Sequence, residues 1–168
     1  MALNFMLEYL DKNLNKLYKL TGYIAAIFLI LVAVFILLGI SSRIFGFYIR
    51  GLAEYSGYSM AASSFFALSY TFYDRAHIII TLFLENLNPS NRKFAEIWCL
   101  SIATIFSGFL AFYFTKMTYI SIKSEERSEG ADEILIWIPQ SAVALGSIIF
   151  FICVFHHLIN SVLGKKIK

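Results

Sequence analysis

The stretch TGYIAAIFLILVAVFILLGISS, residues 21–42, contains no charged residue and no proline. A helix needs about 20 predominantly apolar residues to cross the hydrocarbon core of a bilayer. The stretch therefore predicts a membrane-spanning helix. It is too long for the apolar region of a secretory signal peptide, and no small-residue cleavage site follows it, so no cleaved leader is expected.

Three further apolar blocks of spanning length follow, near residues 55–73, 95–115 and 139–160. Charged residues make up only 15% of the chain, whereas soluble domains carry about a quarter. Little of the sequence is left over for a soluble domain. The composition predicts an all-α membrane protein with one domain over residues 1–168 and four transmembrane helices.

Residues 1–20 form a different pattern. Leucine and methionine recur at helical spacing, with Asn, Asp, Glu and Lys between them. This pattern predicts an amphipathic helix that lies on the cytoplasmic surface before the first span. The alternative is a frayed tail.

The distribution of basic residues predicts the orientation. One side of the predicted membrane carries more Lys and Arg than the other. The richer side has Lys12, Lys16, Lys19, Arg75, Arg92, Lys93, Lys165, Lys166 and Lys168, and the poorer side has Arg43, Arg50, Lys116, Lys123 and Arg127. The positive-inside rule places both termini in the cytoplasm. Because the basic residues are spread over short segments with no single patch, no nucleic-acid partner is expected.

Two prolines mark helix starts. Asn88-Pro89 is suited to begin the third helix, and no breaker follows until Gly130, so this helix is predicted to be longer than a bilayer requires. Pro139 fits a helix start better than a helix middle, so residues 134–138 are predicted to run extended. A proline kink inside a longer fourth helix is the alternative.

Small residues indicate close helix packing. The second span is rich in Ser and Ala and is expected to be enclosed, whereas the first is expected to face lipid. Packing within the bundle explains part of this pattern, and contact with a partner membrane protein explains the rest. The candidate positions for the partner interface are Ser63, Ala67, Ala103, Ser107 and Ala111. Cys99 and Cys153 are predicted to be buried thiols without a disulfide.

Chemistry-bearing groups are scarce. No carboxylate, Lys or Arg lies in the middle of a span, where ion and proton pathways are marked by such groups. No nucleophile–base pair, phosphate-binding loop or zinc spacing is present, so no enzyme is predicted, and no cofactor or metal. His77, His156 and His157 are interpreted as interfacial polar residues. The alternative is axial ligation of a haem, as in a cytochrome b-like membrane anchor of a redox complex.

Four elements together resemble one family. Glu54-Tyr55 opens the second span, Arg75-Ala76-His77-Ile78 closes it, Asn88-Pro89 precedes the third and Ile138-Pro139 precedes the fourth. The chain resembles the small membrane subunit, of the DctQ type, of tripartite ATP-independent periplasmic (TRAP) transporters.

The resemblance implies a scaffold in the bacterial inner membrane. It implies a large multispan subunit that carries the sodium-driven transport machinery, and a periplasmic binding protein that delivers an organic anion such as a carboxylate. Glu54, Arg75 and His77 would then serve the partner interface or membrane anchoring. Arg75 and His77 are expected to end the second helix at the cytoplasmic interface, with residues 78–87 lying in the membrane surface. A simple positive-inside anchor without a specific partner is the alternative for these two residues.

Overall fold

The computed structural model describes residues 2–84, 89–131 and 133–163, and the side chains within 11–74, 92–131 and 133–163. Throughout this part of the chain the regular structure is helical. The elements are α1 (Ala2–Ile44), α2 (Leu52–Leu84), α3 (Pro89–Ser124) and α4 (Trp137–Val162). The predicted all-α class is therefore confirmed.

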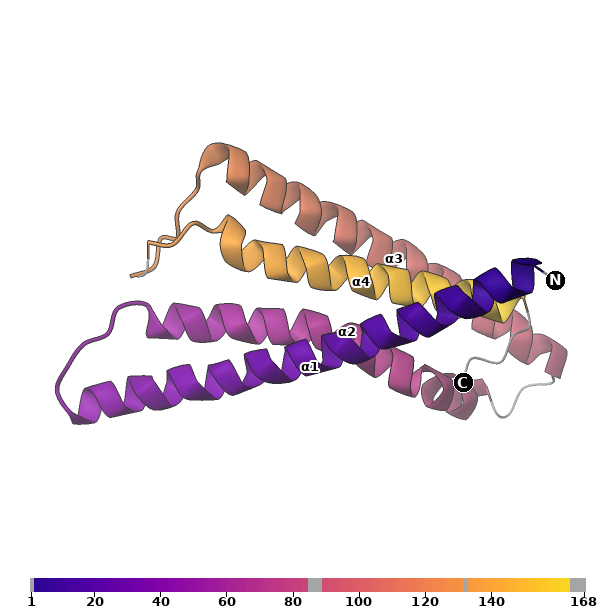
Figure 1. Cartoon of the computed structure of the whole chain (residues 1–168), viewed down its shortest axis with the longest axis horizontal. Coiled ribbons are helices and arrows are strands. Elements are labelled where there is room, and N and C mark those ends of the chain that lie inside the picture. Colours follow the sequence, from indigo (N-terminus) through magenta and orange to yellow (C-terminus); the bar gives the residue numbers. More distant parts are fainter. Residues whose placement is uncertain (1, 85–88, 132, 164–168) are drawn as a thin grey trace.

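The helices form two antiparallel hairpins, α1/α2 and α3/α4, joined along α2 and α4 (Figure 1). Their packing order is α1, α2, α4, α3, with only small contacts between α1 and α4 and between α2 and α3. The hairpins converge at the end that holds the start of α1 and the end of α4, and they diverge toward the two loops. This row of helices leaves α1 and α3 each packed mainly against one neighbour.

The first helix has no boundary near residue 20. The predicted amphipathic helix and the predicted first span are one continuous helix of 43 residues. The sequence around Leu20-Thr21-Gly22 has no proline, and one glycine costs a helix only about 1 kcal/mol. Tyr18 and Thr21 are buried by neighbouring helices, so this part of α1 belongs to the bundle.

The second helix also runs further than predicted. It continues to Leu84, so the expectation that Arg75 and His77 end it is wrong. Charged residues do not interrupt a helix by themselves, because their backbone N–H and C=O groups make the same helical hydrogen bonds as those of other residues. In the middle of the row α2 packs against both α1 and α4, as its small residues predict.

The third and fourth helices begin as their prolines predict. Pro89 is the first residue of α3, whose 36 residues correspond to about 54 Å at 1.5 Å per residue. Pro139 lies in the first turn of α4, where its missing N–H is not needed. Before it, Leu135 forms an antiparallel bridge with Arg127. The prediction that residues 134–138 run extended is wrong for its second half, because Ile136 already has helical backbone angles and α4 begins at Trp137. A proline is tolerated anywhere in the first turn of a helix, so it need not be the first helical residue. The alternative of a proline kink inside a longer helix is excluded.

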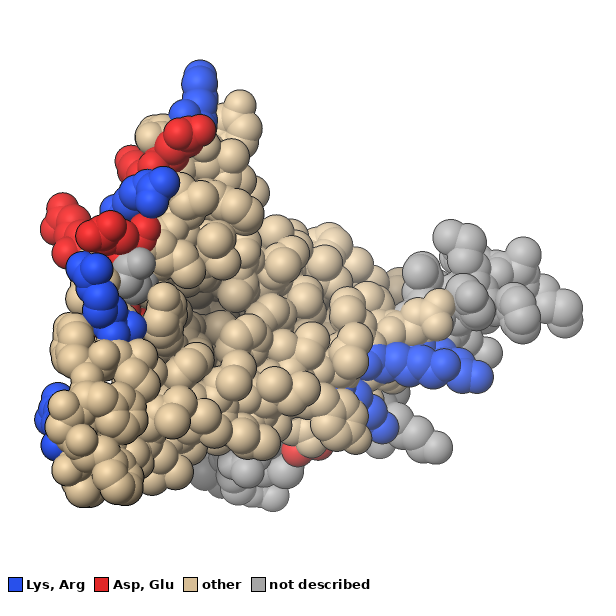
Figure 2. Space-filling view, turned by 60° about the vertical axis from the view of Figure 1, so that its left-hand side comes forward, with Lys and Arg blue, Asp and Glu red and all other residues tan. Residues whose placement is uncertain are grey.

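Three of the described segments are long and apolar enough to cross a membrane: Asp11–Ile44, Arg92–Ser124 and Trp137–Val162. The part of α2 whose side chains are described, residues 52–74, is not among them, because its serines and tyrosines lower its hydropathy. The predicted count of four spans is therefore not confirmed. Charged side chains gather at the two ends of the molecule, with an uncharged surface between them (Figure 2). This is the pattern of a protein whose middle lies in hydrocarbon.

Candidate functional site

The small residues bring helices of this chain together. Ser63 on α2 donates a hydrogen bond to the Ala25 carbonyl of α1 at 2.9 Å. A Cβ on Gly146 of α4 would lie 2.8 Å from the Phe65 Cβ of α2. These close approaches form the α1–α2 and α2–α4 seams.

The predicted small-residue positions do not form one surface. Ser63 is buried at the α1–α2 seam, and Ala67 on the same helix is partly buried. On α3, Ser107 and Ala111 are buried and Ala103 is partly buried, and the main packing partner of α3 is α4. Packing within the chain therefore accounts for the burial of Ser63, Ser107 and Ala111.

A polar cluster joins α1 to α4 at the end where the hairpins converge. We call Asp11, Tyr18, His156 and Asn160 the terminal polar cluster. The Tyr18 hydroxyl lies 3.3 Å from His156 Nδ1. His156 Nε2 lies 2.7 Å from Asp11 Oδ1 and 2.9 Å from the Asn160 amide nitrogen. Because α1 and α4 otherwise make little contact, this cluster is the main polar link between them.

The geometry of the cluster favours one tautomer of His156. A carboxylate only accepts hydrogen bonds, so Nε2 must carry the proton that it donates to Asp11. The Asn160 amide nitrogen is itself a donor, so it lies beside this protonated nitrogen without donating to it. The Tyr18 hydroxyl can then donate to Nδ1. Tyr18 is fully buried and His156 is nearly so, and buried polar groups that find such partners hold a packing arrangement in place.

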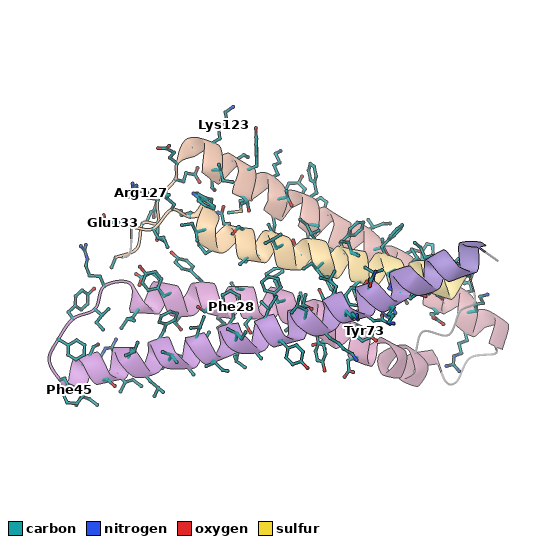
Figure 3. All side chains as sticks on the ribbon, viewed as in Figure 1. Phe28, Phe45, Tyr73, Lys123, Arg127 and Glu133 are labelled. Carbon is teal, nitrogen blue, oxygen red and sulfur yellow. The ribbon has the colours of Figure 1, made fainter. Side chains whose placement is uncertain are left out.

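At the opposite end, the start of α2 is tied to the loop between α3 and α4. Glu54 lies in the first turn of α2, and its Oε1 accepts a hydrogen bond from the Ala131 N–H at 3.1 Å. The Tyr58 hydroxyl lies 2.9 Å from Ser128 Oγ. Lys123, Arg127 and Glu133 all lie at this end (Figure 3). Glu54 thus positions a loop of its own chain.

The outer helices expose two apolar faces. The α1 face is mainly aliphatic and the α3 face is rich in aromatic rings. The exposed side chains at helical spacing are Leu20, Tyr23, Ile27, Ile30, Val34 and Leu37 on α1, and Phe94, Trp98, Ile102, Ile105, Phe109 and Phe112 on α3. Faces of this extent require lipid or protein as their surroundings.

A family model for the DctQ component of tripartite ATP-independent periplasmic transporters matches residues 31–164. The match covers all of α2, α3 and α4 and the last third of α1, residues 31–44. The chain belongs to the DctQ family. Comparison with curated proteins gives no match, and comparison with solved structures gives none.

The DctQ assignment gives no support to a haem-bearing anchor. Both ring nitrogens of His156 lie within hydrogen-bonding distance of other side chains. The His157 ring packs edge-on against Phe72, with centroids 5.2 Å apart. Among the described residues, no group of three His, Cys, Asp or Glu side chains could hold a metal ion.

Three predictions on single side chains have different outcomes. The side chains of Arg75 and His77 lie outside the described residues, so their roles stay predictions. Cys153 is buried and free as predicted, but Cys99 is exposed on α3. The burial of Cys99 was inferred from its apolar surroundings. That inference fails because an apolar residue in this DctQ chain can face outward.

The terminal polar cluster is not among the sites predicted from the sequence. Asn160 follows His156 by four residues, and this spacing places both on one face of α4. This pair of polar residues in an apolar helix is the feature of the sequence that could have indicated the cluster. Its partners Asp11 and Tyr18 are 145 and 138 residues away from His156, and only the folded arrangement brings them to it.

Proposed function

We propose that this DctQ chain is the scaffold subunit of a sodium-driven transporter that imports an organic anion such as a carboxylate. In this proposal it packs against a large multispan subunit that moves the substrate, and it supports docking of a periplasmic binding protein. The observation that carries the proposal is the α3 face. This face lies at the edge of the helix row, where no other helix of the described chain covers it.

The composition of the two faces suggests what covers each. Aromatic side chains are enriched at protein–protein interfaces. Lipid tails are as apolar as leucine, so aliphatic side chains are sufficient for a face that contacts lipid. Ile105 on the α3 face is 73% exposed and lies among phenylalanines, and Ile30 on the α1 face is 63% exposed among aliphatic residues. We therefore propose that the α3 face contacts the large subunit and the α1 face contacts lipid.

A scaffold role also fits the charges of the spans. Glu96 is the one carboxylate between residues 95 and 115, and it accepts a hydrogen bond from Ser161 at the end of α4. Charged groups that carry ions or anions lie inside the membrane and face a pathway. The proposal therefore assigns the pathway to the large subunit.

The orientation belongs to the same proposal. The chain spans the bacterial inner membrane with both termini in the cytoplasm, because the terminal segments and the 74–94 connection carry more Lys and Arg than the other two loops. The loop tied to Glu54 then faces the periplasm, where the binding protein docks. Arg75 and His77 are proposed to serve as cytoplasmic anchors that also contact the large subunit.

Site-directed cross-linking tests the proposal. Ile105→Cys and Ile30→Cys are made in a chain whose Cys99 and Cys153 are replaced, and each is co-expressed with a candidate large subunit and treated with a thiol cross-linker. We expect Ile105→Cys to cross-link to the large subunit and Ile30→Cys to remain unlinked. Ser107→Cys, at a position that is 2% exposed, is the matched buried control. Absence of any cross-link from both exposed positions, together with failure to co-purify, would contradict the proposal.

A further inference from the structure

A cleft opens between α1 and α2 near the end that holds the termini. Its volume is about 410 Å³, and its walls are Lys19, Gly22, Tyr23, Tyr70, Tyr73 and Asp74. We call it the tyrosine cleft. Tyr73 lies where α1 crosses α2 (Figure 3). No residue of the terminal polar cluster lines it, so the cleft is a separate feature.

The shape of the cleft follows from one glycine. Because Gly22 has no side chain, the Tyr70 ring approaches α1 closely, and a Cβ on Gly22 would lie 2.8 Å from two carbons of that ring. Tyr73, another wall of the cleft, packs against the buried Tyr18 ring, with centroids 5.4 Å apart. Two of the tyrosine walls are therefore held in place by close packing, Tyr70 against Gly22 and Tyr73 against Tyr18.

Two opposite charges flank the hollow. Lys19 and Asp74 are both exposed, and neither forms a salt bridge in the part of the chain that the structure describes. The cleft thus offers an ammonium group, a carboxylate and three phenol rings within one small volume. A ligand that matches this set carries an anionic and a cationic group a few bonds apart.

The position of the cleft points to a membrane lipid. Lys19 is the last charged residue before the apolar run that begins at Thr21, so the cleft lies at the depth where hydrocarbon gives way to head groups. The α1 face leads away from it, with Tyr23 and Ile27 exposed. Acyl chains of a lipid bound in the cleft can lie along this face.

We propose that the tyrosine cleft binds the phosphoethanolamine head group of a membrane phospholipid. The Lys19 ammonium pairs with the phosphate. The primary ammonium of the lipid donates to the Asp74 carboxylate and lies against the tyrosine rings, which attract cations. A phosphatidylglycerol head group has no cation to pair with Asp74, and its negative charge is repelled by that carboxylate. A phosphatidylcholine head group has a cation but no N–H to donate to Asp74.

Native mass spectrometry of the purified full-length chain tests the proposal. The chain in detergent is titrated with phosphatidylethanolamine, phosphatidylglycerol or phosphatidylcholine of the same acyl chains. We expect phosphatidylethanolamine to bind about three- to fivefold more tightly than phosphatidylglycerol, the ratio expected for one exposed ion pair. Asp74→Asn should abolish this preference, and Lys19→Gln should weaken both phosphatidylethanolamine and phosphatidylglycerol. Lys123→Gln, at the opposite end of the molecule, is the control and should change neither.

Conservative variants and a soluble competitor complete the design. Asp74→Glu keeps the carboxylate and should therefore keep the preference for phosphatidylethanolamine. This result would show that Asp74→Asn loses the preference through its missing charge and not through a folding defect. Soluble phosphoethanolamine should not displace the lipid at equal concentration, because it lacks acyl chains. Equal binding of all three lipids by the unmodified chain would overturn the proposal, as would an unchanged preference in Asp74→Asn. Displacement by soluble phosphoethanolamine at equal concentration would overturn the assignment to a lipid.

Discussion

Gly146→Ala should destabilise the chain at the seam between α2 and α4. The added Cβ would lie 2.8 Å from the Phe65 Cβ, 3.0 Å from the Phe65 carbonyl carbon and 3.2 Å from the Phe66 nitrogen. These atoms belong to the backbone or are fixed to it, so no side-chain rotation relieves the overlap. The two helices must move apart, and overpacking of this kind costs about 1–3 kcal/mol.

Gly57→Ala is the matched control, because a Cβ there meets nothing within 4 Å. Both substitutions replace a helical glycine by alanine, so the gain in helix propensity, about 1 kcal/mol, is common to both. Relative to Gly57→Ala, the Gly146→Ala chain should have a free energy of unfolding that is lower by about 1–3 kcal/mol. The difference between the two free energies of unfolding measures the cost of the overlap at the α2–α4 seam.

Unfolding in mixed micelles provides the assay. Sodium dodecyl sulfate is added to the chain in a mild detergent, and the loss of helix is followed by circular dichroism. Phe65→Ala should not rescue Gly146→Ala, because alanine keeps the Cβ and backbone atoms that the new methyl group meets. If Gly146→Ala unfolds at the same detergent fraction as Gly57→Ala, α2 and α4 do not approach as closely as the structure shows.

Three further predictions address the terminal polar cluster, the anchors and the orientation. His156→Phe should lower the free energy of unfolding by about 1–3 kcal/mol, because it leaves the partly buried Asp11 carboxylate without its partner; an unchanged unfolding midpoint in the same assay would refute this. Arg75→Ala should leave the chain in the membrane but reduce both recovery of the large subunit and anion uptake, with Arg75→Lys rescuing only in part because a point charge does not replace the guanidinium fork; full recovery and uptake would leave Arg75 a topology anchor only. In a chain without native cysteines, Glu129→Cys should react with an impermeant thiol reagent added to intact cells and Lys93→Cys should not; the reverse labelling would invert the topology.

The parts of the fold that could be predicted from the sequence are those fixed by local chemistry. Pro89 begins α3 because its ring fixes a helical backbone angle and its missing N–H is not needed in the first turn. Pro139 lies in the first turn of α4 for the same reason. The apolar runs predict helices because a backbone in hydrocarbon must satisfy its hydrogen bonds internally.

The parts that could not be predicted depend on contacts between distant residues. The helix row α1, α2, α4, α3 cannot be deduced from small residues alone, because all four helices carry them. The charges of Arg75 and His77 predict an end of α2 at these residues, but charged side chains mark a change of environment and do not break the backbone, so α2 continues to Leu84. The terminal polar cluster required the fold, since Asp11 and His156 meet only when α1 and α4 lie side by side.

Reconstitution into liposomes tests the central claim most directly. Uptake of a labelled organic anion under a sodium gradient is compared for this chain alone, for the large subunit with the binding protein, and for all three components together. The scaffold account predicts uptake only when all three are present. Uptake by this chain alone, or full uptake when this chain is omitted, would contradict it.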